Sequence, residues 1–245
     1  ARMPALPAHD GGSPSNALGT LLIDASARGD LLQIRNLLAL GAPVNHALPA
    51  TDIVTSGWSE AGQTPLTCAV RRGDLEMARL LLDHGANPNA STVTGQTALI
   101  YAASHHNAAI VNSLLASGAV PNVRDSIGTT PLLQVFDQNA DLGPINQGFP
   151  KGETREDATG VLLALLNAGA DPRIADPDGD TPLHKIGILT NSQPLLIDSL
   201  LKHKANVDAR NHSGRTPLMT CAGNLTTVKA LLAHGAKVNA VHADR

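Results

Sequence analysis

The tripeptide Thr-Pro-Leu recurs along this chain of 245 residues, with copies that begin at Thr64, Thr130, Thr181 and Thr216. Thr97-Ala98-Leu99 is a variant copy, and Thr20-Leu21-Leu22 is a degenerate one. The copies at Thr64, Thr97 and Thr130 follow one another at intervals of 33 residues. A fixed period of this length indicates an array of small similar units, in which each unit packs against its neighbours and no single central core is required.

A second signature, Leu-Leu-x-x-Gly-Ala, follows each copy of the first. Its intact copies begin at Leu37, Leu81, Leu114, Leu165 and Leu231, and a weaker copy with Lys204 in place of the glycine begins at Leu200. The two signatures define six units, which we number repeats one to six and place at approximately residues 18–46, 59–90, 91–124, 125–174, 175–209 and 210–240. Residues 1–17 are rich in Pro, Gly, Ala and Ser, so we expect a flexible leader before a single domain at 18–245.

Each unit carries the signals of two short helices. Thr is a favourable helix N-cap, and Pro fits the first helical position because its missing N–H would have no partner there, so Thr-Pro predicts the start of a first helix. Small residues such as Ala69 and Ala102 allow close approach of a neighbouring helix. The run Leu75–Leu82 predicts a second helix, which Gly85 ends because glycine accepts positive φ. The Asp- and Gly-rich link to the next Thr predicts an extended arm with a turn.

The 33-residue period, with Thr181-Pro182-Leu183-His184 as its fullest copy, resembles the ankyrin-repeat family over roughly residues 18–240. The resemblance implies an all-α fold, a solenoid of stacked helix-turn-helix units with projecting β-hairpin or loop arms. In that family the arm tips and the exposed side of the first helices bind other proteins, and the repeat itself carries no catalytic residue.

Two insertions interrupt the period. About eleven extra residues lie between repeats one and two, at 47–58, and include Trp58, the only tryptophan. About eighteen extra residues separate the two helices of repeat four, at roughly 141–157, and carry Phe149. The first insertion is interpreted either as a cover for the thin first repeat or as an arm that presents Trp58 to a partner. The second is either one wall of a binding groove or a tolerated surface loop.

Composition argues against several classes of partner. The formal charge is −3 and the pI is near 6.4, so no general basic field favours nucleic acid. No apolar run reaches the ~18 residues of a membrane span. Cys68 and Cys221 belong to repeats two and six, too far apart for a disulfide, so we expect free thiols and favour a cytoplasmic protein over a processed exported one. We expect a monomer in the absence of a partner.

Catalytic and metal-binding classes find little support in the sequence. It contains none of the phosphate-loop, nucleophile-elbow, zinc-protease or Cys-x-x-Cys signatures. His84, His203 and His234 are expected at the ends of second helices, where an imidazole can reach the last carbonyls. His105 and His106 are adjacent, so they point to different sides of a helix and cannot form a metal site by themselves. We predict no catalytic residue, no metal and no cofactor.

The resemblance implies that the chain binds a partner protein through the concave face of the array. Carried over position by position, it assigns to this surface Arg28, Glu60, Gln63, Arg71, Arg72, Val93, Thr94, Gln96, Ser104, His105, Ile127, Thr129, Asp137, Gln138, Asp178, Asp180 and Arg215. The two insertions add Trp58 and Phe149. The surface should be basic at repeats one and two and acidic toward Asp178. The substitution Arg71→Glu should therefore weaken binding and leave stability nearly unchanged.

An alternative interpretation is an inhibitor or immunity-type protein that occludes one toxin or enzyme. A rigid concave array with unique insertions suits that role, which would depend on the Trp58 arm or on the 141–157 loop. A general adaptor would instead use the regular surface and would tolerate the loss of either insertion.

Overall fold

The computed structural model describes residues 14–49, 60–136, 158–186 and 194–240, and this part of the chain contains twelve helices, two in each repeat. The first helices of the six repeats are α1 (Pro14–Arg28), α3 (Pro65–Arg71), α5 (Ala98–Ser104), α7 (Pro131–Gln134), α9 (Pro182–Lys185) and α11 (Pro217–Thr220). The second helices are α2 (Leu31–Ala39), α4 (Leu75–Asp83), α6 (Ala108–Ala116), α8 (Ala158–Asn167), α10 (Pro194–Lys202) and α12 (Leu225–Ala233).

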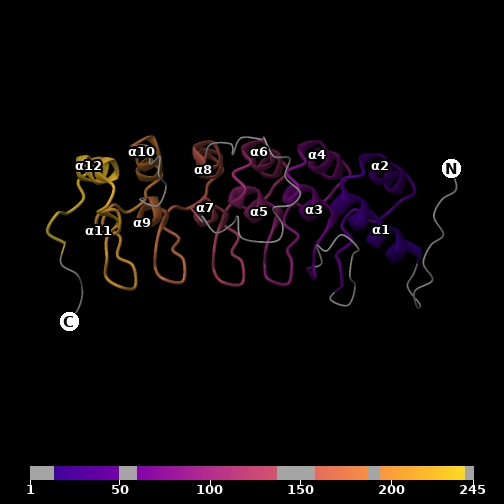
Figure 1. Ribbon diagram of the computed structural model, residues 1–245, viewed down its shortest axis with the longest axis horizontal. Coiled ribbons are helices and arrows are strands. Elements are labelled where there is room, and N and C mark those ends of the chain that lie inside the picture. The colour runs from indigo at the N-terminus through magenta and orange to yellow at the C-terminus, as the bar shows by residue number, and fades with distance from the viewer. Residues whose placement is uncertain (1–13, 50–59, 137–157, 187–193, 241–245) are drawn as a thin grey trace.

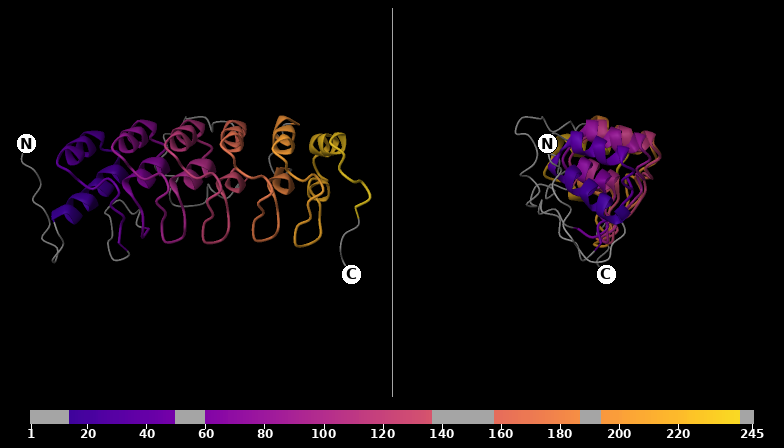
Figure 2. Two further views of the ribbon diagram at one scale, coloured as in Figure 1. Left: turned by 180° about the vertical axis from the view of Figure 1, so that it is seen from behind. Right: turned by 90° about the vertical axis from the view of Figure 1, so that its right-hand side faces the viewer.

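The helices form two rows along one long stack (Figure 1). The first helices make an inner row, the second helices make an outer row, and the arms between repeats project below the inner row. The end-on view in Figure 2 superimposes successive repeats, with all the described arms on one side. Apart from one isolated bridge between Ser91 and Thr97, the described segments contain no β-structure. The predicted all-α stack of helix-turn-helix units is confirmed.

Threonine caps the inner helices of repeats two, three and four as the sequence predicts, whereas the Thr181 and Thr216 side chains accept no such bond. The side chains of Thr64, Thr97 and Thr130 accept a hydrogen bond from the N–H three residues later, at 3.3, 3.4 and 3.3 Å. Outer helices begin in the same way after Asp or Asn, for example at Asp30 and Asp74, whose carboxylates accept from the third N–H at 2.9 Å. Each of these bonds satisfies a helix donor that has no partner within the helix, so the repeats are defined largely by local sequence.

Repeat one departs from this pattern. Its inner helix α1 begins at Pro14, so Thr20 lies inside the helix and donates its hydroxyl to the Asn16 carbonyl at 3.2 Å. The expectation that order begins near Leu18 is therefore wrong by one helical turn. Thr20 is not followed by proline, and the helix instead begins at Pro14, a residue that fits the first helical position.

The hydrophobic core is continuous and consists mainly of aliphatic side chains from all six repeats. The leucine of each outer helix that begins the second signature is fully buried at Leu81, Leu114, Leu165, Leu200 and Leu231, each with 0% of its surface exposed. Inner-helix alanines such as Ala69 and Ala102 are also fully buried and allow the rows to approach closely. Hydrophobic contact between neighbouring repeats therefore replaces a central core.

The start of the first insertion folds back onto the stack. Leu48 is 2% exposed and packs with Ile23, Ala27 and Cys68. Its backbone pairs with the beginning of repeat two, since the Leu48 N–H donates to the Gln63 carbonyl at 2.8 Å and the Leu48 carbonyl accepts from the Gly62 N–H at 2.7 Å. These contacts favour the covering role for the base of the insertion; Trp58 lies outside the described residues.

The outer helices end in a left-handed residue. Gly41, Gly85, Gly118, Gly169 and Gly235 take φ between 80 and 90° there, and in repeat five the position is Lys204 with φ of 72°. A side chain is strained in this conformation, so the weaker sequence signature of repeat five corresponds to real backbone strain.

Candidate protein-binding surface

The structure divides the expected partner-binding residues by exposure. Six are exposed: Arg28, Val93, Thr94, Ile127, Asp178 and Arg215. Seven are half-buried: Glu60, Arg72, Gln96, Ser104, His105, Thr129 and Asp180. Two are buried: Gln63 and Arg71. Trp58, Asp137, Gln138 and Phe149 lie outside the described residues.

Each arm is a tight turn held by its own first side chain. In repeat four, Asp125 Oδ1 accepts hydrogen bonds from the N–H groups of Ile127 and Thr129, at 3.1 and 2.7 Å. In repeat five, Asp176 Oδ1 accepts from Asp178 and Asp180, at 3.0 and 2.8 Å. This arrangement satisfies the backbone of the turn and leaves the tip side chains pointing to solvent.

Neighbouring arms are also joined to one another by backbone hydrogen bonds. The bonds run from Val93 N to Ala61 O at 2.9 Å, from Ser126 N to Thr94 O at 2.8 Å, and from His212 N to Asp178 O at 3.0 Å. Val93 and Ile127 therefore lie on adjoining, fixed arms, and they remain 71% and 66% exposed. Two large, exposed apolar side chains thus lie on adjoining arms, and we call this pair the tip patch.

A polar cluster supports this patch from the inner helices of repeats two and three. The Tyr101 hydroxyl donates to Glu60 Oε2 at 2.8 Å, the Thr94 hydroxyl donates to Glu60 Oε1, and the Arg71 guanidinium lies over the Tyr101 ring, 5.3 Å from its centroid. Burial acts to raise the pKa of the Glu60 carboxyl, but hydrogen bonds from Thr94, Tyr101 and Thr92 and the charge of Arg71 outweigh it and lower the pKa. Glu60 is thus a carboxylate that fixes the Thr94 arm.

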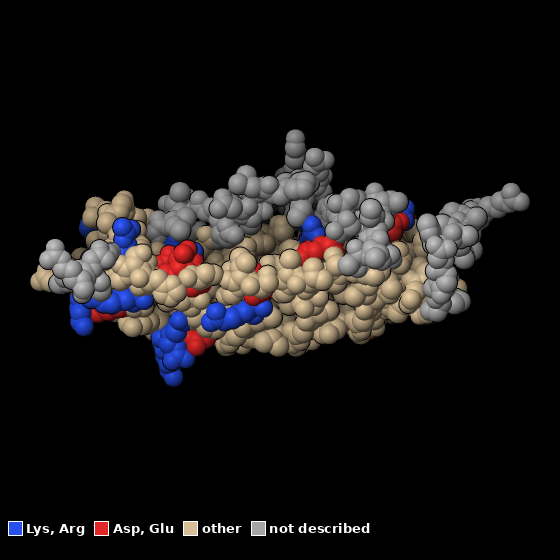
Figure 3. All heavy atoms as spheres, turned by 90° about the horizontal axis from the view of Figure 1, so that it is seen from below, with Lys and Arg blue, Asp and Glu red and all other residues tan. Residues whose placement is uncertain are grey.

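Arg71 corrects the expectation of a free basic surface at repeats one and two. Only 6% of Arg71 is exposed because its side chain is covered at the interface of α3 with α5. Arg72 donates to the Ala27 carbonyl at 2.9 Å, and Arg28 pairs with Asp24 at 2.8 Å. Figure 3 shows the arm side of the molecule, where the Lys and Arg side chains left visible between undescribed residues gather mainly toward the C-terminal end. Of the three arginines expected on this surface, Arg71 is therefore buried, Arg72 is half-buried and Arg28 is exposed.

Gln63 was also expected on the surface, yet none of it is exposed. Its backbone carbonyl accepts from Leu48, so Gln63 lies beside the base of the first insertion. Tyr101, in contrast, was not selected from the sequence, although it is the only tyrosine and stands one turn after the Thr97 cap. A single large polar aromatic in an inner helix otherwise rich in alanine was the available signal.

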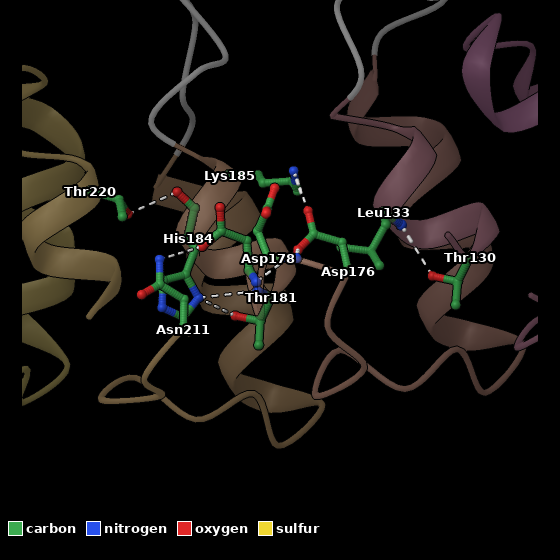
Figure 4. Close-up of polar contacts among 10 residues, drawn as sticks. Thr130, Leu133, Asp176, Asp178, Thr181, His184, Lys185, Asn211 and Thr220 are labelled. Carbon is green, nitrogen blue, oxygen red and sulfur yellow. Dashed lines mark hydrogen bonds and ion pairs between the residues drawn. The ribbon is translucent and has the colours of Figure 1, made fainter. Parts of the chain in front are cut away.

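His184 joins repeats five and six. Its Nδ1 accepts from the Thr181 N–H at 3.1 Å, which leaves Nε2–H to donate to the Arg215 carbonyl at 3.0 Å. The Thr220 hydroxyl donates to the His184 carbonyl at 2.9 Å (Figure 4). Burial lowers the pKa of His184 from its ordinary value, so the ring is held neutral. This histidine has a structural role in the helix cap and in the repeat interface.

The other candidate chemical groups are also engaged in structure. His105 and His106 donate to different carbonyls, Tyr101 O at 2.7 Å and Val135 O at 2.8 Å, and do not converge. Cys68 and Cys221 are buried free thiols, as predicted, and burial raises the pKa of Cys68 to about 12. Within the described ranges, no three His, Cys, Asp or Glu side chains are placed to hold a metal ion. No helix described there is long and apolar enough to cross a membrane.

The histidines near the ends of outer helices follow the expected pattern with one exception. His84 and His203 donate from Nδ1 to the carbonyl four residues earlier, Leu80 and Ser199, both at 2.8 Å. His234 instead contacts Asp198 of the preceding repeat through Nε2 at 2.6 Å. These contacts stabilise helix ends and repeat interfaces.

Comparison with known proteins agrees with the repeat architecture. A family model described as ankyrin repeats in three copies matches residues 21–125 and 155–242. The crystal structure of the ankyrin repeat protein EF0377 superposes with a TM-score of 0.66 at 21% identity, over 88% of this chain and 97% of that one. No match was found among curated proteins. Ankyrin-repeat domains are generally protein–protein interaction modules and are typically not enzymes. This chain belongs to the ankyrin-repeat family.

Proposed function

We propose that this protein binds a partner protein through its arm tips and the adjoining ends of the inner helices, without chemistry of its own. The observation that carries the proposal is the tip patch, in which Val93 and Ile127 stay largely exposed on arms held by backbone hydrogen bonds. Exposed apolar side chains on preorganised loops give up little conformational entropy on binding, and the centres of protein interfaces are apolar.

The neighbouring tips suggest the chemistry of the partner surface. Asp178 of repeat five is exposed, and its backbone is fixed by Asp176 and by the bond to His212. A complementary surface would place an apolar residue against Val93 and Ile127 and a basic residue against Asp178. The cluster of Glu60, Tyr101 and Arg71 contributes by holding the Thr94 arm in place.

The experiment begins with affinity capture from the source organism and identification of the partner, followed by titration of the purified pair. Val93→Asp and Ile127→Asp should each weaken binding roughly tenfold or more, because interface energy is concentrated in a few central residues. Val238→Asp is the matched control, since Val238 is also 71% exposed but follows the last outer helix. Equal affinities for all three variants would contradict the proposal.

The occluding-inhibitor role is the second candidate. The base of the first insertion covers the stack, and because Leu48 is buried and paired with Gly62 and Gln63, the same base would give a partner-binding arm a fixed starting point. In that role Trp58→Ala, or removal of residues 141–157, should abolish inhibition of the captured partner. An adaptor that uses the tip patch should keep its affinity after both changes.

A further inference from the structure

Three kinds of polar link connect neighbouring repeats. The first is made by an asparagine just after the outer helix, at Asn45, Asn89 and Asn122. Each side-chain nitrogen donates to a glycine carbonyl of the next repeat: Asn45 to Gly85 at 3.0 Å, Asn89 to Gly118 at 2.9 Å and Asn122 to Gly169 at 2.9 Å. Each side-chain oxygen accepts from the backbone N–H two residues beyond that glycine: Asn45 from Asn87 at 2.7 Å, Asn89 from Val120 at 2.8 Å and Asn122 from Asp171 at 2.8 Å. Repeats one to four are joined in this way.

Repeat four cannot make this link to repeat five. Arg173 stands where the preceding repeats carry asparagine, and its guanidinium turns back to Asp171 of its own repeat, with contacts of 2.9 and 2.8 Å. In repeat five Asp208 occupies the position and accepts the Lys237 N–H of repeat six at 2.9 Å. Among the interfaces that the structure describes, the asparagine-type link is thus lost between repeats four and five, which we call the 4/5 junction.

The second link is the backbone bond between arms. Its donor is the second residue of the arm, which is Val93, Ser126 and His212 in repeats three, four and six. In repeat five that residue is Pro177, which has no N–H to donate. The bond is therefore chemically impossible at the 4/5 junction.

The third link joins side chains of neighbouring arms. Gln96 donates to Asp125 at 2.8 Å between repeats three and four, and Asn211 donates to Asp180 at 2.7 Å between repeats five and six. The residue of repeat five that corresponds to Asp125 is Asp176, and its carboxylate instead pairs with Lys185 of the same repeat at 2.6 Å (Figure 4). At this junction two charged side chains, Arg173 and Asp176, both bind within their own repeats.

The arms are also farther apart at this junction. At the other junctions the turn glycine of one arm lies close to the backbone of the next arm. A methyl group on Gly62 would lie 2.8 Å from Thr92 Cα, one on Gly95 would lie 2.9 Å from Asp125 Cα, and one on Gly179 would lie 2.6 Å from His212 N. At Gly128 the nearest atom beyond the adjoining residues belongs to Arg124 of the same repeat, at 3.7 Å. The inner helices α7 and α9 likewise make less contact than any other neighbouring inner pair.

We propose that the array consists of two cooperative units, repeats one to four and repeats five and six, that meet at a weak 4/5 junction. In a linear array, cooperativity depends on the contacts between neighbours, and each hydrogen bond between repeats changes the opening equilibrium by roughly two- to tenfold. The second unit is held together by Asn211, His184, Thr220 and His234 contacts across its own interface. It opens without disrupting repeats one to four.

The test is native-state hydrogen exchange of the full chain by mass spectrometry. We expect a step at the 4/5 junction, with amides of Ile197 to Leu200 exchanging at least about tenfold faster than those of Ile110 to Leu114. The double substitution Arg173→Asn and Pro177→Ser restores the two missing links. Asn at 173 corresponds to Asn122 of repeat three, and Ser at 177 corresponds to Ser126 in the arm of repeat four. The double substitution should slow exchange in repeats five and six about tenfold and reduce the step.

The mirror variant, Asn122→Arg with Ser126→Pro, removes the same two links between repeats three and four. It should move the step in exchange rate to the junction of repeats three and four. The amides of repeat four should then exchange as fast as those of repeats five and six, while the amides of repeats one to three remain protected. A gradual change of protection along the wild-type chain would overturn the proposal, as would unchanged exchange after Arg173→Asn with Pro177→Ser. The restoring variant decides the matter if the mirror variant does not fold.

Discussion

The spacing of the arms can be tested by comparing one small substitution at two equivalent glycines. Gly95 and Gly128 occupy the same turn position in repeats three and four, with φ of 78 and 84°. Alanine at either site incurs the same left-handed strain, about 1–2 kcal/mol, and the same change in the unfolded chain. The difference between the two variants therefore reports the space beside the turn.

At Gly95 the new methyl group would lie 2.9 Å from Asp125 Cα and 3.0 Å from Ser126 N. These are backbone atoms, and moving them disturbs the Ser126 to Thr94 hydrogen bond of 2.8 Å. Overpacking of this kind costs about 1–3 kcal/mol. Gly128→Ala meets only the end of the Arg124 side chain at 3.7 Å, which adds little.

We expect Gly95→Ala to destabilise the protein by about 2–5 kcal/mol and Gly128→Ala by about 1–2 kcal/mol. Urea unfolding followed by far-UV circular dichroism gives both values from the shift in midpoint, and both residues belong to repeats one to four, so they report on one transition. Equal destabilisation would mean that arms four and five are as close as arms three and four, which would refute the argument for a gap.

Three further outcomes follow from the contacts of single side chains. Arg71→Glu should destabilise by about 3–5 kcal/mol because it places a carboxylate in a buried position beside Glu60. The exposed Arg79→Glu should change stability by less than about 1 kcal/mol, and urea unfolding of both variants measures the difference. Lys204→Gly should stabilise by about 1 kcal/mol, visible as slower amide exchange in repeats five and six, and no change would mean that the φ of 72° carries no strain. Because the pKa of His184 is depressed, the unfolded chain binds the extra proton, so the contribution of His184 to stability is full above about pH 6.5 and is lost as pH falls through the folded pKa. Exchange in repeats five and six should therefore accelerate as pH is lowered below 6.5, after correction for intrinsic rates, and His184→Gln should remove most of this dependence.

Local signals in the sequence were sufficient to predict most of the fold. The Thr caps, the Pro at the first helical position and the terminal glycines act within one turn of chain, so their effect does not depend on distant residues. The regular period then places each repeat beside the next. The start of α1 was placed too late because Thr20 was taken as the start signature, whereas Thr20 lies inside the helix.

The candidate surface was harder to predict because exposure depends on contacts between repeats. Arg71 stands at the end of an inner helix, where the repeat pattern suggests a surface residue, but Tyr101 of the next repeat covers it. Gln63 is covered by a backbone pairing with Leu48 that follows from the insertion. By contrast, the changes at Arg173 and Pro177 are visible when the repeats are aligned with one another, although their meaning requires knowledge of the bonds that Asn122 and Ser126 make.

Backbone hydrogen bonds join Leu48 to Gly62 and Gln63, so the two ends of the intervening segment lie side by side on the repeat stack. A segment closed in this way can change length at low cost, since each doubling of a flexible loop adds only about 0.6 kcal/mol of closure entropy. The anchoring Leu48 side chain stays buried whatever lies between the two ends. This position is therefore suited to carry a fluorescent label or an inserted guest domain while the six repeats below it keep their packing.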